Sequence, residues 1–172
     1  MTILAEDLLA GVGLRVDGRV AWGRPIPSNK PGVYVITQSG KARYEAPIDV
    51  GKVRSWMDIA RDMTLDGKPG PEPADLTRRL AEFWLSDEPI LYVGLAGTSL
   101  RNRTGQFVRH VPGYNKPHSG GYWLKLLSDD CLGTAEILWS ECAEPDVSEF
   151  RVLSAFARRH GRLTPDAPLE WL

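Results

Sequence analysis

The sequence predicts an α+β fold in which three core strands are combined with several helices. Runs rich in β-branched and aromatic residues, which are typical of strands, occur at residues 33–37, 90–94 and 134–142. Segments whose apolar residues recur at helical spacing lie among these runs. The chain has 172 residues, 42% of them hydrophobic, which is enough for a domain with a buried core. We therefore expect residues 1–172 to form a single domain.

Residues 1–30 are expected to form an extension that precedes the core. Residues 3–9 predict a weakly apolar helix. Residues 18–31 are rich in glycine and proline and predict a loop with one short strand near residues 20–22. Gly32 then leads into the first core strand.

Residues 38–88 are polar and charged and predict two helices, near residues 50–63 and 75–85, separated by a turn-rich stretch. In the second helix the apolar residues at helical spacing are Leu76, Leu80, Phe83 and Trp84. This spacing is typical of an amphipathic helix that packs on the core. A partner-binding surface is the alternative interpretation.

The second core strand is followed by a basic helix. Ser99 is a favoured N-cap residue, so the helix is expected over residues 100–110. At about 100° per residue, one stripe of this helix should face the sheet, and it consists of Leu100, Thr104, Phe107, Val108 and Val111. Arg103 and His110 fall together on the flank of this stripe, about 10.5 Å apart along the helix axis. Such a pair can contact two parts of one extended substrate.

Arg101 and Arg109 fall on the outer face of the same helix, where they suit solubility or phosphate contacts without chemistry. The third core strand is expected over residues 134–142. Pro145 or Asp146 then begins a final helix that reaches Arg159, and the following glycine and proline stop it.

The charge of the chain gives no global attraction for nucleic acid. The net charge is -1 and the pI is about 6.3. From Arg101 to Lys125, however, there are five lysines and arginines, two histidines and no acidic residue. This stretch predicts either a basic surface strip or a phosphate-binding groove.

The N-terminus carries acidic residues where a secretory signal has basic ones, and no apolar run has the roughly 18 residues of a membrane span. We therefore expect a soluble cytoplasmic protein. Cys131 and Cys142 have no metal-ligand spacing, so we interpret them as buried thiols that form no disulfide.

Two tripeptides in the first two core strands, Gly32-Val33-Tyr34 and Tyr92-Val93-Gly94, together resemble the paired signature of the GIY-YIG nuclease superfamily. Arg103 matches the helix arginine of that family, with one extra residue in the preceding loop. Glu149 matches the glutamate that holds a divalent metal. The resemblance covers roughly residues 31–36 and 89–163, and residues 118–124 resemble a His-x-Gly-Gly segment found in a bacterial branch of the superfamily.

The resemblance implies a small central three-stranded, mainly antiparallel sheet flanked by helices. The family usually joins its two signature strands by a short hairpin, so residues 38–88 are expected to form a helical insertion within the domain. The implied activity is that of a Mg²⁺-dependent or Mn²⁺-dependent endonuclease that hydrolyses DNA phosphodiester bonds, in repair, restriction or mobile-element defence. Duplex or branched DNA is the expected partner, and cutting both strands requires a homodimer or two binding events.

The resemblance also implies roles for individual residues. Glu149 would hold the metal, and Arg103 would neutralise charge on the phosphate. The proton of the attacking water would pass to Tyr34, Tyr92 or His110. The expected substrate-binding residues are Arg101, Arg109, Lys116 and His118. Glu149 also lies three residues after Asp146, so a capping box is the structural alternative for its carboxylate.

Two features depart from the family pattern. Phe107 stands where the family often has a histidine or tyrosine, and the asparagine that the family has after the last helix lacks a clear counterpart. Because a phenylalanine cannot transfer a proton, the alternative function is a catalytically weak or inactive DNA-binding or partner-binding module with the same fold.

Overall fold

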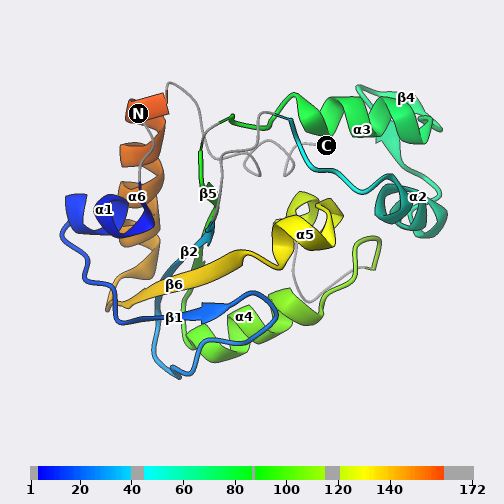
Figure 1. Cartoon of the computed structure of the whole chain (residues 1–172). Coiled ribbons are helices and arrows are strands. Elements are labelled where there is room, and N and C mark those ends of the chain that lie inside the picture. Colours follow the sequence, from blue (N-terminus) through cyan, green and yellow to red (C-terminus); the bar gives the residue numbers. More distant parts are fainter. Residues whose placement is uncertain (1–3, 40–44, 87, 115–120, 161–172) are drawn as a thin grey trace.

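The computed structural model describes residues 4–39, 45–86, 88–114 and 121–160. Its centre is a four-stranded antiparallel sheet with the strand order β1-β6-β2-β5 (Figure 1). The strands are β1 (Gly18–Ala21), β2 (Gly32–Gln38), β5 (Ile90–Ala96) and β6 (Ala135–Glu141). Together with the helices packed on it, this sheet confirms the α+β class, and β2, β5 and β6 are the three predicted core strands.

The prediction of a three-stranded sheet was wrong by one strand. β1 pairs antiparallel with β6, and Gly18 lies opposite Trp139. A Cβ atom at Gly18 would lie 2.5 Å from the Trp139 ring, so the absence of a side chain at Gly18 makes room for that ring. The short strand near residues 20–22 was predicted, but not as part of the central sheet, because only its pairing with β6, distant in sequence, places it there.

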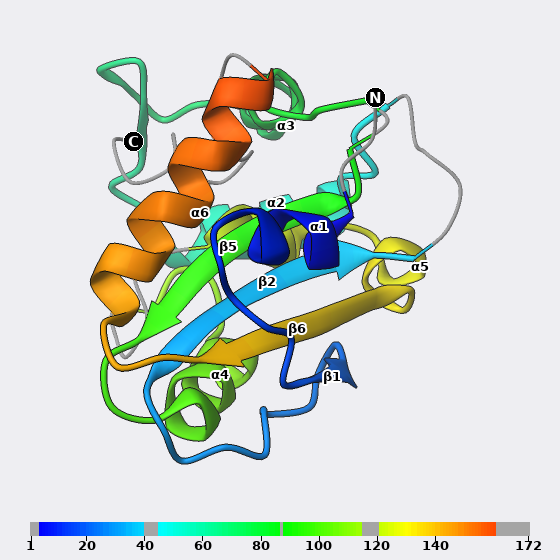
Figure 2. The same cartoon turned by 90° about the vertical axis from the view of Figure 1, so that its left-hand side faces the viewer.

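Helices cover both faces of the sheet. α1 (Ala5–Gly11) and α6 (Pro145–His160) pack on one face and lie in front of it in Figure 2. α4 (Leu100–Arg109) and the 3-10 helix η1 (Tyr122–Leu126) pack on the other face. Because side chains from both faces of β2 are covered, six of its seven residues are buried. This burial explains the unbroken apolar run of the strand.

The segment between β2 and β5 is helical in its described part, as predicted. It contains α2 (Val50–Ile59) and α3 (Pro73–Ala81), both shorter than expected, and a small hairpin of β3 (Thr64–Leu65) and β4 (Lys68–Pro69). The hairpin turns at Asp66 and Gly67, which both have positive φ. The insertion packs on the core through four buried side chains, those of Val53, Leu76, Leu80 and Trp84. The amphipathic interpretation of the second helix is therefore confirmed.

A register shift between β2 and β5 changes which β5 residues face α4. Tyr92 lies opposite Ile36 and Ile90 opposite Thr37, so Leu91 is an extra residue. A bulge of this kind interrupts the alternation of faces along a strand. Leu91 and Tyr92 therefore both join the hydrophobic cluster on the α4 side, whereas Ile90 joins the cluster on the α6 side.

Both cysteines are free thiols, as predicted. Cys131 lies in the short helix α5 (Asp129–Leu132), where it is buried and its Sγ donates a hydrogen bond to Oε1 of Gln38 at 3.3 Å. Cys142 was predicted to be buried, but it is partly exposed just after β6, where the strand has ended. Of the helices in the described ranges, none is long and apolar enough to cross a membrane.

Candidate active site

The two signature tyrosines lie on the same face of adjacent strands. Tyr34 pairs with Gly94 in the register of β2 and β5, so Tyr92 is its diagonal neighbour. The ring centroids of the two tyrosines are 5.8 Å apart, and their planes are inclined by 37°. The fold therefore brings together the two residues that the sequence pattern singled out.

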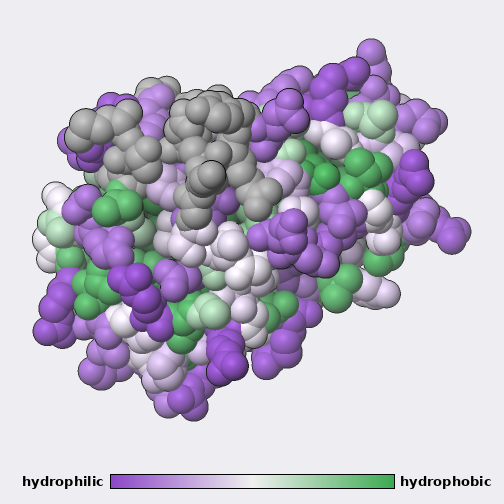
Figure 3. Space-filling model, in the orientation of Figure 1, coloured by the Kyte–Doolittle hydropathy of each residue, from purple (hydrophilic) through white to green (hydrophobic). Residues whose placement is uncertain are grey.

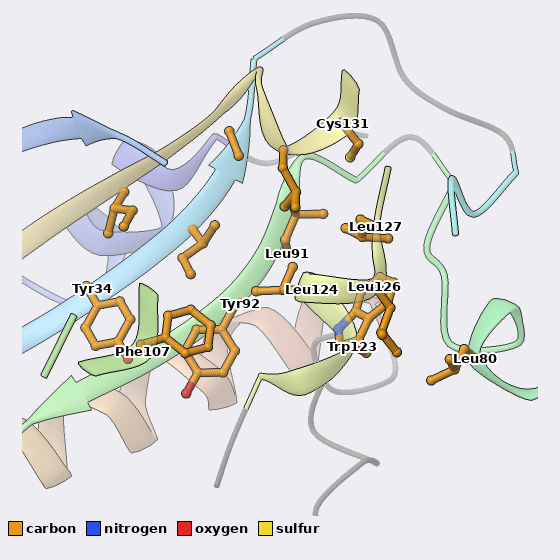
Figure 4. Close-up of a cluster of buried hydrophobic side chains, with 14 of the residues drawn as sticks. Tyr34, Leu80, Leu91, Tyr92, Phe107, Trp123, Leu124, Leu126, Leu127 and Cys131 are labelled. Atoms are coloured by element: carbon orange, nitrogen blue, oxygen red, sulfur yellow. The ribbon is translucent and has the colours of Figure 1, made fainter. Parts of the chain in front are cut away.

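A phenylalanine from α4 packs against one ring of this tyrosine pair. The ring of Phe107 stacks on that of Tyr92, with centroids 5.5 Å apart, and meets the ring of Trp22 edge-on at 5.6 Å. Figure 4 shows the rings of Tyr34, Phe107 and Tyr92 side by side. Tyr34 is 0% exposed and Tyr92 is 8% exposed. Both tyrosines thus belong to the hydrophobic core as well as to the candidate site.

The glycines of the two tripeptides make room for protein groups. A Cβ atom at Gly94 would lie 2.5 Å from the Tyr92 ring and 2.6 Å from Cζ of Tyr34. A Cβ atom at Gly32 would lie 2.9 Å from Cδ1 of Leu100 and would also meet the carbonyl oxygen of Ser140. The close packing of tyrosine rings and of α4 on the sheet therefore accounts for both glycines.

α4 begins as the sequence predicts. Its N-cap is Ser99, whose side chain accepts a hydrogen bond from the backbone N–H of Asn102 at 3.2 Å. Leu100, Thr104 and Phe107 are buried, as expected of the sheet-facing stripe. Val111 is 52% exposed, so the stripe was predicted too long. The reason is that α4 ends at Arg109 and the chain becomes extended at the next residue, which ends the helical periodicity.

The predicted polar residues of α4 differ in exposure. Arg103 is half-buried at the edge of the stripe, and Arg101 and Arg109 are exposed. His110 is the C-cap residue and is only 6% exposed. The helix thus presents three guanidinium groups with access to solvent, whereas the imidazole lies inside the protein. Lys116 and His118, predicted to bind substrate, lie outside the described residues.

Lys125 has a structural role that no local pattern in the sequence predicts. Its Nζ donates hydrogen bonds to the carbonyl oxygens of Val108, at 3.2 Å, and of His110, and so satisfies the end of α4. The ammonium also lies 5.3 Å from the centroid of the Phe107 ring. Burial lowers the pKa of this lysine to about 8. The basic stretch of the sequence therefore does not lie wholly on the surface.

Glu149 lies too far inside α6 to take part in a capping box at the start of that helix. α6 begins at Pro145, and the N–H of Ser148 bonds to the carbonyl oxygen of Glu144, so Glu144 precedes the first turn and Asp146 lies inside it. A capping box between Asp146 and Glu149 is therefore excluded. At about 100° per residue Glu149 falls on the stripe of Val152 and Phe156, which are buried against the sheet. Its side chain is half-buried.

The helices of Arg103 and Glu149 cover opposite faces of the sheet, but they begin at the same end of it. The carbonyl oxygen of Lys30 accepts a hydrogen bond from the N–H of Leu100, at the start of α4. The next carbonyl, that of Pro31, accepts one from the N–H of Cys142, shortly before α6. The start of β2 thus holds both helix N-termini, and Glu149 does not lie on the face that carries Tyr34 and Tyr92.

Within the described ranges, no group of three or more histidine, cysteine, aspartate or glutamate side chains is arranged to hold a metal ion. A half-buried single carboxylate such as that of Glu149 fits a different kind of site, because Mg²⁺ is often held by one or two carboxylates and several waters.

Comparisons with known proteins give no relative for this chain: no protein family, no curated protein and no solved structure matches it.

Proposed function

We propose that this protein is a metal-dependent endonuclease that hydrolyses phosphodiester bonds in DNA. The observation that carries the proposal is the tyrosine pair: Tyr34 and Tyr92 meet across β2 and β5, on the face covered by the helix of Arg103. Glu149 adds a carboxylate on a second helix that begins at the same end of the sheet. These are the residues that the GIY-YIG resemblance implies.

Arg103 supplies the positive charge of the proposed site. A guanidinium group binds phosphate oxygens with a fixed fork of N–H donors and stays charged at every physiological pH. The half-buried position of Arg103 lowers the local dielectric around it, so its attraction for charge developing on the phosphorus oxygens is stronger than in water. The exposed Arg101 and Arg109 add phosphate contacts along the same helix.

Glu149 is the residue that would hold Mg²⁺ or Mn²⁺. When bound, the ion would polarise the phosphate and stabilise the leaving oxygen. Water is the nucleophile in this proposal. Tyr92, the more exposed of the two tyrosines, would act as a phenolate, a form that the charges of Arg103 and the bound ion favour, and would take up the proton of the water directly or through a second water. Tyr34 holds the Tyr92 ring in position through the ring contact.

A second candidate function is a DNA-binding module with the same fold that does not cleave. The complete burial of Tyr34 and the stacking of Phe107 on Tyr92 favour it, because both tyrosine rings then serve the core. His110, the other proposed proton acceptor, is also buried. In this function Arg101, Arg103 and Arg109 bind phosphates, and Glu149 has no metal to hold.

The experiment that tests the proposal is DNA cleavage by the purified chain. Supercoiled, linear, branched and single-stranded DNA are incubated with protein and Mg²⁺, Mn²⁺ or EDTA. We expect cleavage with a divalent metal and none with EDTA. Glu149→Gln and Arg103→Ala should each reduce the rate at least a hundredfold, since each removes a charge that acts on the reacting phosphate.

Two matched variants control for charge alone. Glu144→Gln changes an exposed glutamate just before α6, and Arg158→Ala removes an exposed arginine near its C-terminal end. Both should cleave like wild type. Equal cleavage by wild type and Glu149→Gln would refute the proposed catalysis. Tight, salt-dependent binding without cleavage by any form would instead support the binding module.

A further inference from the structure

A cavity of about 360 Å³ lies between the insertion and the core, in the size range of small-ligand pockets. Trp56 and Ile59 of α2 line one side, and Val111 and Pro112, which follow α4, line it from the core. Its polar lining comes from Asp49, Lys52, Ser55 and Lys125. We call this cavity the α2 pocket. Its walls are apolar with a few polar groups, as in sites for planar organic ligands.

The α2 pocket is held open by direct packing at one rim. Gly113 has a φ of 94°, and a Cβ atom there would lie 2.7 Å from Cγ2 of Ile59 and 3.3 Å from Cδ1 of Trp56. The loop after α4 therefore rests against α2 with no room for a side chain between them. This contact fixes the distance between the two walls, so the pocket exists before any ligand binds.

Large apolar side chains are exposed around the α2 pocket. Ile59 is 39% exposed and Val111 is 52% exposed, and both line it. Tyr114, directly after Gly113, is 59% exposed. Hydrophobic atoms also gather over the insertion on the face seen in Figure 3, at the right of the view. Grouped apolar exposure of this kind is typical of binding sites.

The α2 pocket adjoins the proposed active site. Lys125 lines the pocket, and its ammonium lies 5.3 Å from the centroid of the Phe107 ring. Phe107 in turn stacks on Tyr92. The side chain of Lys125 and the ring of Phe107 therefore connect the pocket to the tyrosine pair. A polynucleotide carries bases and phosphates along one chain, so a single DNA strand supplies a base for the pocket and a phosphate for Arg103.

We propose that the α2 pocket receives one unstacked nucleobase of the DNA substrate, an inference that rests on the proposed function. The apolar walls suit the two faces of a base. At its polar edge, the Ser55 hydroxyl donates to the carbonyl oxygen of Gly51 and keeps its acceptor sites for an amino group of the base. The Lys52 ammonium donates to the carbonyl oxygen of Leu127 and to Asp129 and keeps one further N–H donor for a carbonyl group or ring nitrogen of the base. Because unstacking a paired base costs a few kcal/mol, the protein binds DNA with an unpaired or mismatched base more tightly than a perfect duplex.

The test uses the whole chain in EDTA, so that binding is measured without cleavage. The DNAs carry 2-aminopurine at one position, either unpaired or within a perfect duplex, and fluorescence follows both binding and the environment of that base. We expect wild type to bind the unpaired DNA more tightly. Val111→Asp should weaken that binding about tenfold, the loss expected for one base contact, and leave duplex binding unchanged.

Two further variants make the result specific. Leu4→Asp places the same charge on a residue that is 56% exposed beside α1, on the other face of the sheet, and should bind like wild type. Ser55→Trp fills the α2 pocket from α2 and should reproduce the loss seen with Val111→Asp. Thermal unfolding of each variant checks that it is folded.

The outcomes separate the pocket from the proposed function. If wild type binds neither DNA, the proposed function fails and the nucleobase proposal fails with it. If all variants bind unpaired DNA like wild type, DNA binding stands and the pocket proposal is overturned. A last experiment measures binding of free deoxynucleoside monophosphates to wild type and Val111→Asp. If Val111→Asp weakens their binding but does not weaken DNA binding, the pocket is a site for free nucleotides and the proposal is overturned.

Discussion

Phe107 and Tyr92 form a stacked pair, with ring centroids 5.5 Å apart and planes inclined by 17°, that joins α4 to β5. The resemblance of the sequence to the GIY-YIG pattern singled out Phe107 as a departure from that pattern. The structure gives the residue a packing function, because its ring also contacts Trp22 and the ammonium of Lys125. This side chain, which cannot transfer a proton, thus completes the core over the tyrosines.

Truncation of this ring should destabilise the fold strongly. Phe107 is 1% exposed, so Phe107→Ala leaves a cavity and should lower the free energy of unfolding by roughly 3–5 kcal/mol. Urea unfolding followed by fluorescence measures the effect. The matched control is Phe150→Ala, whose ring is 71% exposed and whose loss should change stability by less than about 0.5 kcal/mol. Similar losses for both would contradict the packing function.

Gly94→Ala should be costly because the new methyl group would lie within 2.7 Å of atoms of both tyrosine rings. Overpacking of this kind should lower the free energy of unfolding by roughly 1–3 kcal/mol. Gly97→Ala is the control, since a Cβ atom there has no neighbour within 4 Å and φ is not in the left-handed region. Chemical denaturation of both variants should leave Gly97→Ala near or above wild-type stability. Equal losses would show that tyrosine packing does not explain Gly94.

Lys125 should make stability rise with pH above about 8. Burial lowers its pKa to about 8, below the usual value of roughly 10.4, so between these pH values the unfolded chain binds more protons than the folded chain. Stability contributed by Lys125 therefore increases as pH rises through this window and is constant below it. Urea unfolding of wild type and Lys125→Arg at pH 7 and pH 9.5 measures the difference. Arginine stays charged throughout, so the difference should move in favour of wild type at the higher pH. An unchanged difference would contradict the lowered pKa.

Glu149 should be required for binding a divalent metal, independently of cleavage. Mn²⁺ added to wild type should lose its free-ion signal in electron paramagnetic resonance as protein is titrated, and Mg²⁺ should restore the signal by competition. Glu149→Gln should leave the free-ion signal unchanged, whereas Glu144→Gln should bind like wild type. Equal Mn²⁺ binding by wild type and Glu149→Gln would remove the metal role from this residue even if DNA is cleaved.

Local signals in the sequence predicted most individual elements. Ser99 and the apolar stripe of Leu100, Thr104 and Phe107 gave α4, because capping and periodicity act over a few residues. The final helix and the three core strands were found for the same reason. β1 was not recognised as part of the sheet, since its partner β6 lies more than a hundred residues away and four residues carry little periodicity.

The candidate site was predicted less completely than the elements. The tyrosine pair followed from two short tripeptides, and the structure brings their rings together. The solvent exposure of each site residue could not be predicted from the sequence, because the burial of a side chain depends on which helix packs over its strand. His110 and Lys125 look alike in the sequence, as basic residues in a basic stretch. In the structure His110 is the buried C-cap residue of α4, whereas Lys125 donates hydrogen bonds to carbonyl oxygens at the end of that helix.

By itself the sequence singled out the residues that the proposed function uses: Tyr34 and Tyr92 beside glycines, Arg103 on a capped helix, and Glu149 near the start of another helix. Side-chain chemistry and local spacing are sufficient for that. Only the tertiary structure decided that the Phe107 ring packs against Tyr92 and that the helix of Glu149 lies on the opposite face of the sheet from the helix of Arg103. It also decided that α2 and the loop after α4 line a common pocket. These relationships depend on packing between segments far apart in the chain, and no local pattern encodes them.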